Sequence, residues 1–428
     1  MSDLYQQSLE RQPEETASGP LSRLLRRRLI DLLSRLRGCE IKLSDAEGDL
    51  KLGSISETDR DPIKLSVQVY SNEFYRMTAT QGSVGAAEAY MEGHWTCSDL
   101  VGLVRILVRN RDLLDSMESG TAKIGGWLLN GWHQLRRNTK TGSRRNIAAH
   151  YDLGNELFEL FLDQNMMYSS AIFADPSESL DTASARKLDR ICQKLELKPG
   201  LRVVEIGTGW GGFALFAAAR YGCHVTTTTI SSEQHALAKQ RVEAAGLQDR
   251  VTLLCDDYRD LDGQYDRLVS IEMIEAIGHQ YLNTYFNKVA SLLKDDGMAL
   301  IQAITIEDHR YQQALKSVDF IKRFIFPGSF IPSVSAMLGA AGRTDLRLYN
   351  LEDIGPSYAL TLRHWRQRFM RQLSEVRALG YPDRFIRMWE FYLAYCEGGF
   401  IERSIGNVHL LLTKPGCRRA EWLPGLGA

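Results

Sequence analysis

Apolar side chains recur at two different spacings in the first part of the chain. Leucines recur every three or four residues over 21–37 with arginines between them, which predicts an amphipathic helix. Residues 39–71 alternate between apolar and polar side chains, as half-buried strands do, and helical spacing returns over 84–117. These segments predict a smaller, accessory α+β N-terminal domain at 21–117. Residues 1–20 are polar, and we expect them to be disordered.

A second pattern begins near residue 181, where short apolar runs alternate with helical segments. Alternation of this kind is typical of a doubly wound, mostly parallel sheet, so the predicted fold class is α/β. The predicted strands are 201–206, 224–230, 251–255, 268–271 and 298–304, and the predicted helices are 183–197, 213–221 and 232–245. A final antiparallel strand pair is expected at 346–349 and 407–413, with a helix over 358–379.

A basic stretch separates the two patterns. No acidic residue occurs between Glu118 and Asp152, while lysines, arginines and two tryptophans (Trp127 and Trp132) do. We assign 118–146 to a linker and 147–428 to a catalytic domain. Two interpretations stay open for the linker and for the helix at 21–37. The helix either packs one face on its own domain or lies on an anionic membrane surface. The linker is either solvated or in contact with phospholipid head groups, where each cation contributes about 1 kcal/mol.

Composition narrows the function classes. The 52 basic and 53 acidic residues give a net charge of −1, which argues against a generally basic nucleic-acid-binding protein. The seven cysteines are scattered without zinc-type spacing, so we expect a reduced, cytoplasmic protein without a metal site. No apolar run is long enough for a membrane span, and because residues 1–18 are polar and contain no apolar core, we expect no signal peptide there.

The strand at 201–206 leads into the turn Gly207-Thr-Gly-Trp-Gly-Gly212. Glycines there let the backbone approach a ligand at the carboxyl end of a strand. The spacing G-x-G-x-G-G, with Glu205 two residues before it, fits S-adenosylmethionine better than a dinucleotide. Hydroxyls of 226–232 and Gln234 are candidates for the ribose, and Asp257 and Tyr258 for the adenine.

Seven motifs together resemble the cyclopropane-fatty-acyl-phospholipid synthase family, in order and in spacing, over nearly the whole chain. The motifs are 82–95, 150–158, 167–173, 207–212, 257–260, 274–278 and 324–328. The resemblance implies a Rossmann-like class I methyltransferase sheet and a cytoplasmic enzyme at the inner face of the membrane. The cofactor contacts that it implies are Tyr168, Ser169, Gly207, Gly209, Thr229, Ile230, Gln234, Asp257, Tyr258 and Ile271.

The implied reaction transfers a methylene group from S-adenosylmethionine to the cis double bond of an acyl chain in membrane phospholipid, giving a cyclopropane fatty acid. It passes through a carbocation that aromatic faces can stabilise. Phe326, Tyr168 and Tyr358 are the first candidates, followed by aromatic residues of 388–392. By the same resemblance, residues 346–414 include an insertion that covers the acyl pocket.

The base that deprotonates this cation is, in the family, a bound bicarbonate. Its predicted ligands are Glu275, Tyr358 and the backbone amide of Ile304, with Ser170 and Gln302 where the family has Cys and His. Both replacements keep a hydrogen-bond donor but change its acid–base character. Glu275 itself is the alternative base, since an apolar pocket raises the pKa of a carboxyl group.

Several alternatives remain open. The segments 272–276 and 302–305 resemble a subgroup that includes makers of mid-chain methyl- or methylene-branched fatty acids. More remote alternatives are a methyltransferase for another substrate and a catalytically silent lipid-binding protein. Isolated histidines, His409 among them, are given no role, and the oligomeric state, homodimer included, is left open.

Overall fold

The computed structural model describes residues 19–117 and 153–418. The predicted disordered terminus up to residue 18, and the predicted linker from 118 to 146 with its arginines, lie outside the described residues. The chain divides into two compact units. We call residues 19–117, 317–325 and 373–402 the N-terminal unit, and residues 153–316, 326–372 and 403–418 the larger unit.

The N-terminal unit is built on a four-stranded sheet of order β2-β1-β3-β4. β1 pairs antiparallel with β2 and parallel with β3, and β3 pairs antiparallel with β4. The strands are β1 (Cys39–Asp45), β2 (Gly48–Leu52), β3 (Ile63–Val69) and β4 (Trp95–Cys97). Its helices are α2 (Pro20–Leu33), α3 (Glu73–Met91), α4 (Leu100–Arg109), α5 (Arg111–Met117), α16 (Leu373–Ala378), α17 (Asp383–Ile401) and the π-helical turn η5 (Ile321–Ile325).

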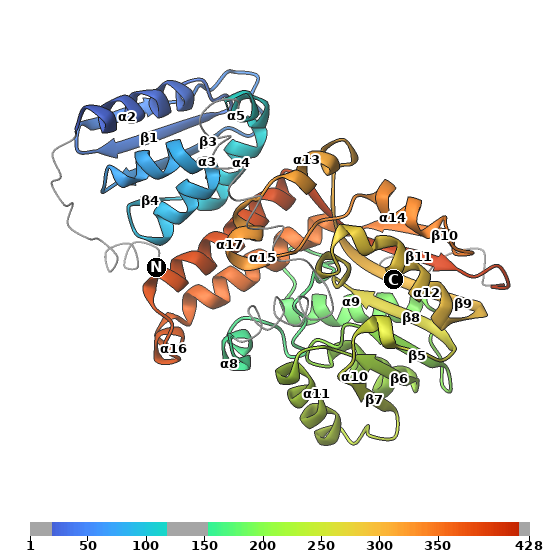
Figure 1. The fold of residues 1–428 in the computed structure, drawn as a ribbon. Helices are drawn as coiled ribbons and strands as arrows, with labels where there is room; N and C mark the ends of the chain where they lie inside the picture. The colour runs from blue at the N-terminus through green and yellow to red at the C-terminus, as the bar shows by residue number, and fades with distance from the viewer. Residues whose placement is uncertain (1–18, 118–152, 419–428) are drawn as a thin grey trace. The chain divides into compact units, whose positions relative to one another are not determined.

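The larger unit contains a seven-stranded sheet of order β10-β11-β9-β8-β5-β6-β7 (Figure 1). Strands β5 to β9 are parallel, and β11 lies antiparallel between β9 and β10. The strands are β5 (Arg202–Ile206), β6 (His224–Thr228), β7 (Val251–Leu254), β8 (Tyr265–Ile271), β9 (Leu293–Ile306), β10 (Arg347–Asp353) and β11 (Ile405–Thr413). This confirms the predicted doubly wound α/β sheet and its final antiparallel pair.

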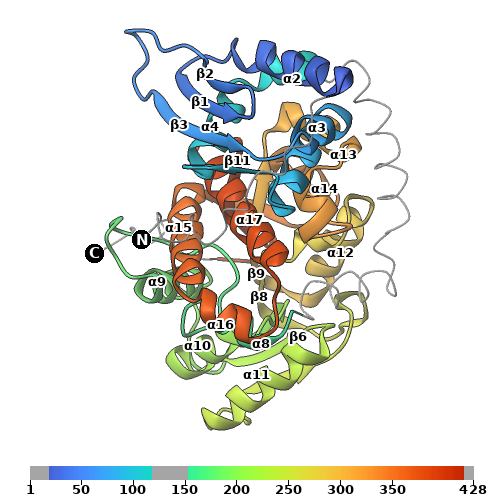
Figure 2. The ribbon, with the colours of Figure 1, turned by 90° about the vertical axis from the view of Figure 1, so that its left-hand side faces the viewer.

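Helices cover both faces of this sheet, which is why its strands are apolar on both sides. Figure 2 shows α9 and α10 on one side of β8 and β9, with α12 and α14 on the other. Val203 of β5 packs into one apolar core and Val204 into the opposite one. The helices are α8 (Asn155–Glu159), α9 (Leu180–Lys194), α10 (Gly212–Tyr221), α11 (Ser232–Ala244), α12 (Leu282–Leu292), α13 (Tyr311–Lys316), α14 (Val334–Ala341) and α15 (Gly355–Arg371). Single 3₁₀ turns are η1 (Tyr258–Asp260), η2 (Ile274–Ala276), η3 (His279–Tyr281) and η4 (Asp308–Arg310).

Two predicted elements are wrong in detail. The helical spacing over 84–117 concealed β4, which forms because its three residues add a strand to β3. The single helix predicted at 358–379 is two helices, since the backbone of Gln372 leaves the helical conformation between α15 and α16. That break coincides with the passage of the chain from the larger unit to the N-terminal unit.

Candidate active site

The glycine-rich turn lies where β5 ends. From β5 the sheet continues through β6 and β7 on one side and through β8 and β9 on the other. Open α/β sheets bind ligands at such a switch point. Gly207 has φ +101° and Gly209 has φ +52°, so both lie in the left-handed region that favours glycine. A Cβ at Gly209 would meet no atom within 4 Å, so this part of the turn borders open space.

The other predicted cofactor residues lie around this turn. The Thr229 hydroxyl donates to Gln234 Oε1 at 2.9 Å just beyond β6. Both oxygens of Asp257 accept from the Arg259 guanidinium at 2.7 Å, so this carboxylate is already paired. Ile230 follows β6, Tyr258 begins η1 and Ile271 ends β8.

Residues 168–170 connect the predicted cofactor contacts to a buried polar site. The Tyr168 ring packs against Trp365 and Phe326, with centroids 5.2 and 6.4 Å away. The hydroxyl of Ser169 accepts from the buried Lys187 ammonium at 2.9 Å. The Ser170 hydroxyl donates to the carbonyl of the next residue at 2.9 Å, so it is not turned toward a bound anion.

Glu272, directly after β8, is the centre of the polar site. Its Oε1 accepts from the Ser170 backbone amide at 3.0 Å, from Gln302 Nε2 at 2.8 Å and from Asn407 Nδ2 at 2.6 Å. Its Oε2 accepts from the Tyr358 hydroxyl at 2.7 Å. Burial raises the pKa of Glu272, and the hydrogen bonds from Ser170, Tyr358 and Gln302 oppose that shift by stabilising the charged form.

Glu275 lies one turn further on, in η2. Its Oε1 accepts from the Ile304 backbone amide at 2.6 Å, while Oε2 is buried and has no partner among the described residues. Burial, and then the charge of Glu272, raise the pKa of Glu275 to about 8. The structure therefore divides the groups predicted to hold one bicarbonate between two carboxylates.

A chain of buried side chains fixes the orientation of Gln302. His409 Nε2 is 3.1 Å from Gln302 Oε1, and His409 Nδ1 is 3.4 Å from Lys194 Nζ, which pairs with Glu352. Burial and then the nearby Lys194 charge lower the pKa of His409 well below its ordinary value, so the ring is neutral. A neutral ring that donates from Nε2 makes Gln302 Oε1 the acceptor, so Gln302 Nε2 faces Glu272.

Two further buried charges lie beside the cofactor-binding turn. Burial lowers the pKa of Lys187 to about 8 and raises that of Glu205 to about 8. The Thr227 hydroxyl donates to Glu205 Oε2 at 2.6 Å. Each of these charged groups has a polar partner, which limits the free-energy cost of burying it.

The aromatic residues predicted to face the cation divide between the two units. Tyr358 packs edge-on against Trp365 at 6.1 Å, so the larger unit holds an aromatic cluster of Tyr168, Phe326, Tyr358 and Trp365. Trp389, Phe391 and Tyr392 lie on α17 in the N-terminal unit.

Replacing Glu275 with glutamine tests the raised pKa of its carboxyl group. The folded protein holds a proton that the unfolded chain releases above its ordinary pKa of 4.5. This contribution to stability is complete below pH 4.5 and is lost as the pH rises through about 8, at up to about 1.4 kcal/mol per pH unit. Denaturant unfolding between these pH values should show that the free energy of unfolding falls less steeply with pH in Glu275→Gln, because glutamine has no titrating proton. Its side-chain oxygen still accepts from the Ile304 amide. An unchanged pH slope would contradict the assignment.

Comparison with known proteins places this site in a family. The family model described as mycolic acid cyclopropane synthetase matches residues 138–410. The chain belongs to this family. It is 41% identical over 334 residues to the tuberculostearic acid methyltransferase of Mycobacterium tuberculosis, covering 76% of this chain and 77% of that protein. It is 36% identical over 341 residues to the cyclopropane-fatty-acyl-phospholipid synthase of Escherichia coli, covering 79% and 85%.

Solved structures of this cyclopropane synthetase family share their fold with more than half of this chain. The cyclopropane synthase MmaA2 of Mycobacterium tuberculosis superposes with a TM-score of 0.60 at 28% identity, covering 63% of this chain and 98% of that one. The same values hold for mycolic acid cyclopropane synthase CmaA1 complexed with SAH and CTAB. The protein is a fatty-acyl methyltransferase of this family with a Rossmann-like sheet, and S-adenosylmethionine is its cosubstrate. The glycine turn with its open face fits that group.

Proposed function

We propose that this protein transfers a one-carbon unit from S-adenosylmethionine to the cis double bond of an acyl chain in membrane phospholipid, giving a cyclopropane fatty acid. The observation that carries the proposal is the position of the Glu272–Glu275 carboxylate pair. The pair lies beside the aromatic cluster and follows β8, which neighbours the glycine turn of β5. An alkylated alkene needs both features, an electron-rich wall and a base.

The residues of the site divide the work of this reaction. The turn at Gly207 and Gly209 lets the cosubstrate approach the backbone closely, and the cosubstrate supplies the methyl group. The alkene carbon takes that methyl group as its bond to sulfur breaks, and Tyr168, Phe326 and Trp365 face the resulting cation. A base then removes a proton from the added methyl group, and the ring closes. The sequence predicts a bound bicarbonate as this base, with the Glu275 carboxylate as the alternative.

A branched product is the second candidate. The tuberculostearic acid methyltransferase is more similar to this chain than the Escherichia coli synthase is, at 41% against 36% identity. Loss of a proton from a neighbouring chain carbon would leave an unsaturated methyl-branched chain. A hydride shift that moves the cation to the methyl-bearing carbon, followed by loss of a proton from the added methyl group, would leave a methylene branch.

Product analysis separates these outcomes. Fatty-acid methyl esters from cells expressing the chain should show monounsaturated acids heavier by one CH₂ unit. Mild hydrogenation should leave that mass unchanged for a ring and raise it by two hydrogens for a methylene branch. A saturated methyl branch would carry the two extra hydrogens from the start. Acyl chains of unaltered mass would contradict the proposed function.

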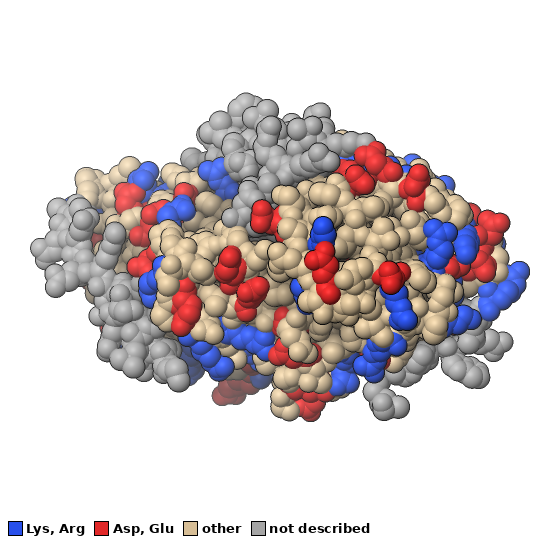
Figure 3. All heavy atoms as spheres, turned by 90° about the horizontal axis from the view of Figure 1, so that it is seen from below, with Lys and Arg blue, Asp and Glu red and all other residues tan. Residues whose placement is uncertain are grey.

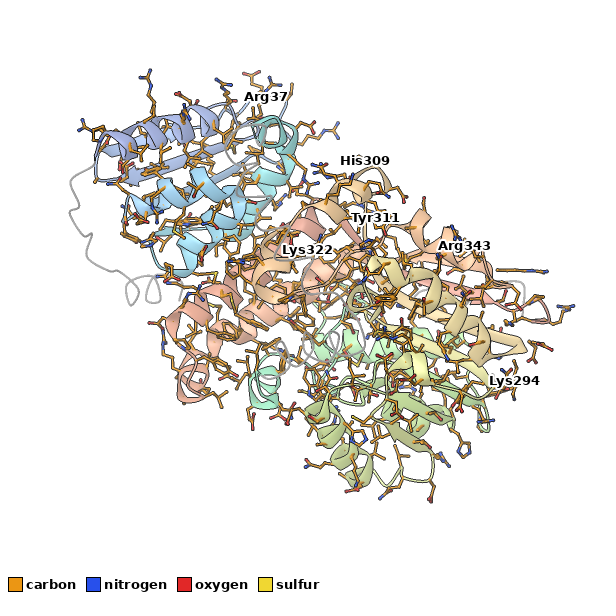
Figure 4. All side chains as sticks on the ribbon, in the orientation of Figure 1. Arg37, Lys294, His309, Tyr311, Lys322 and Arg343 are labelled. Carbon is orange, nitrogen blue, oxygen red and sulfur yellow. The ribbon has the colours of Figure 1, made fainter. Side chains whose placement is uncertain are left out.

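We also propose that the protein works peripherally at the inner face of the membrane. Among the described helices, none is long and apolar enough to cross a bilayer. Helix α2 leaves Leu21 and Leu24 exposed, at 65% and 48%, between arginines, while Leu25, Leu29 and Leu32 are half-buried. Arg37 lies on the surface beyond α2 (Figure 4), and acidic and basic side chains intermingle on the face in Figure 3. An apolar edge on a basic helix suits an anionic lipid surface.

The double variant Leu21→Ser, Leu24→Ser should bind anionic phospholipid vesicles about 30-fold more weakly, since each exposed leucine contributes roughly 1 kcal/mol on partial insertion. Vesicle sedimentation measures this change, and calorimetric affinity for S-adenosylmethionine provides the control. Leu348→Ser, which replaces an equally exposed leucine (47%) of the larger unit, is the matched variant. If the double variant binds vesicles as well as wild type does, α2 is not part of the membrane contact.

A further inference from the structure

Glu272 occupies the place at which the motifs predict a bound bicarbonate. Two of the groups predicted to hold that ion, the Gln302 side-chain amide and the Tyr358 hydroxyl, donate to the Glu272 carboxylate, and Ser170 donates through its backbone amide rather than through the predicted hydroxyl. Asn407 adds a fourth donor that the motifs did not predict. Because these N–H and O–H groups already have an anion, the site does not need one from solution.

The hydrogen bonds also show which of the two neighbouring carboxylates carries the charge. Glu272 accepts from four donors through its two oxygens, whereas Glu275 accepts from the Ile304 amide at Oε1 and has no partner at Oε2 among the described residues. Two adjacent carboxylates do not both ionise readily, since each charge disfavours the other. Glu272 has more hydrogen-bond donors to stabilise a negative charge, so it is the ionised member of the pair.

The backbone at Glu272 is held in an uncommon conformation. Its φ of +48° lies in the left-handed region, which costs a non-glycine residue about 1 kcal/mol or more. Its N–H donates to the Gln302 carbonyl at 2.8 Å, which fixes this conformation against β9. Strain of this kind persists where the surrounding structure enforces it, and here it aims a carboxylate into the ring of donors.

The carboxylate retains room for a proton. Oε1 has three donors, but Oε2 has only the Tyr358 hydroxyl among the described residues, so one of its lone pairs is free. Glu272 is half-buried rather than fully enclosed. Tyr358 also belongs to the aromatic cluster, so this oxygen lies at the border between the polar site and the cation-stabilising wall.

We propose, on the basis of the proposed function, that Glu272 is the base of the reaction and that the protein needs no bicarbonate. The added methyl group loses a proton to Oε2, and the C–H electron pair closes the third bond of the ring. The products are the cyclopropane, S-adenosylhomocysteine and a protonated Glu272, which returns its proton to water before the next cycle. No further reactant is required.

The first arm of the test uses purified wild type with S-adenosylmethionine and vesicles of monounsaturated phospholipid. Turnover should be equal in buffer stripped of carbon dioxide and in buffer supplied with bicarbonate. A wild type that alkylates no acyl chain under either condition would overturn the proposed function and this inference together. A wild type that is active only with bicarbonate would overturn the inference alone.

The second arm replaces Glu272 with glycine, which accepts the left-handed backbone without strain. Glu272→Gly should bind S-adenosylmethionine with unchanged affinity but turn over about 10²- to 10⁴-fold more slowly. Added formate or bicarbonate should raise the turnover of Glu272→Gly at least about tenfold, because the anion can bind to the donors that the Glu272 carboxylate has left. Glu272→Gln should be equally slow and should not be rescued, because its side chain fills that space.

Glu243→Gln, which alters an exposed carboxylate of α11, is the control for a general loss of acidic charge. Its turnover should equal that of wild type. Near-normal turnover by Glu272→Gly, or slow turnover that neither anion improves, would show that Glu272 is structural and would refute the proposal. The rescue is the readout that a structural role would not produce.

Discussion

Gly209→Val is expected to weaken binding of S-adenosylmethionine by about 5- to 150-fold while leaving the protein folded. The new Cβ would meet no protein atom within 4 Å, so the apo protein has room for the side chain. Valine would instead project into the space where the cosubstrate approaches the turn, and forced overlap of this kind costs about 1–3 kcal/mol. Isothermal titration measures the affinity, and thermal unfolding checks the fold.

Gly246→Val is the matched control for this variant. Gly246 also has a left-handed backbone, at φ +66°, and its Cβ would also meet nothing within 4 Å, but it follows α11 rather than β5. Both variants therefore pay a similar conformational cost, and only Gly209→Val should lose the ligand. Equal affinity of the two variants for S-adenosylmethionine would show that the turn does not bind the cosubstrate.

Tyr358→Phe is expected to lower kcat by about 10- to 100-fold with little change in affinity for S-adenosylmethionine. The substitution removes one hydroxyl, which donates to Glu272 Oε2 at 2.7 Å, and keeps the ring that packs against Trp365. A hydrogen bond to a charged group contributes about 1.5–3 kcal/mol, which corresponds to this loss. Rates at saturating vesicle concentration separate kcat from KM.

Tyr285→Phe is the comparison for that experiment. Tyr285 is fully buried in the apolar core around α12, and among the described residues its hydroxyl makes no hydrogen bond to Glu272 or Glu275. Its substitution should leave kcat near the wild-type level. Similar rates in Tyr358→Phe and wild type would show that the hydroxyl does not act on the reacting site.

The sheet could be predicted because its signals are local. The run at 201–206 and the glycines after it require a strand, a tight turn and a helix, and the structure has β5, the turn and α10 there. The break between α15 and α16 could not be predicted, because neither glycine nor proline marks Gln372. Helical periodicity continues through this position although the backbone does not.

The polar site was only partly predictable, since distant segments build it. The pairing of β11 with β9 places His409 opposite Gln302 and Asn407 opposite Ile304, a register that no local motif reveals. A usable signal was nevertheless present, because Asn407 and His409 interrupt an otherwise apolar strand, and Lys187 lies among the apolar positions of α9. Polar residues at buried positions need partners, so such interruptions point to a network.

The most direct measurement of the central claim follows the methyl group itself. Purified protein is incubated with S-adenosylmethionine carrying a deuterated methyl group and with vesicles whose phospholipids have monounsaturated acyl chains. Mass spectrometry of the separated acyl chains and head groups then locates the label. We predict deuterium in the acyl chain, on the added carbon that is bonded to the carbons of the former double bond. Deuterium confined to the head group, or absent from the lipid, would contradict the account.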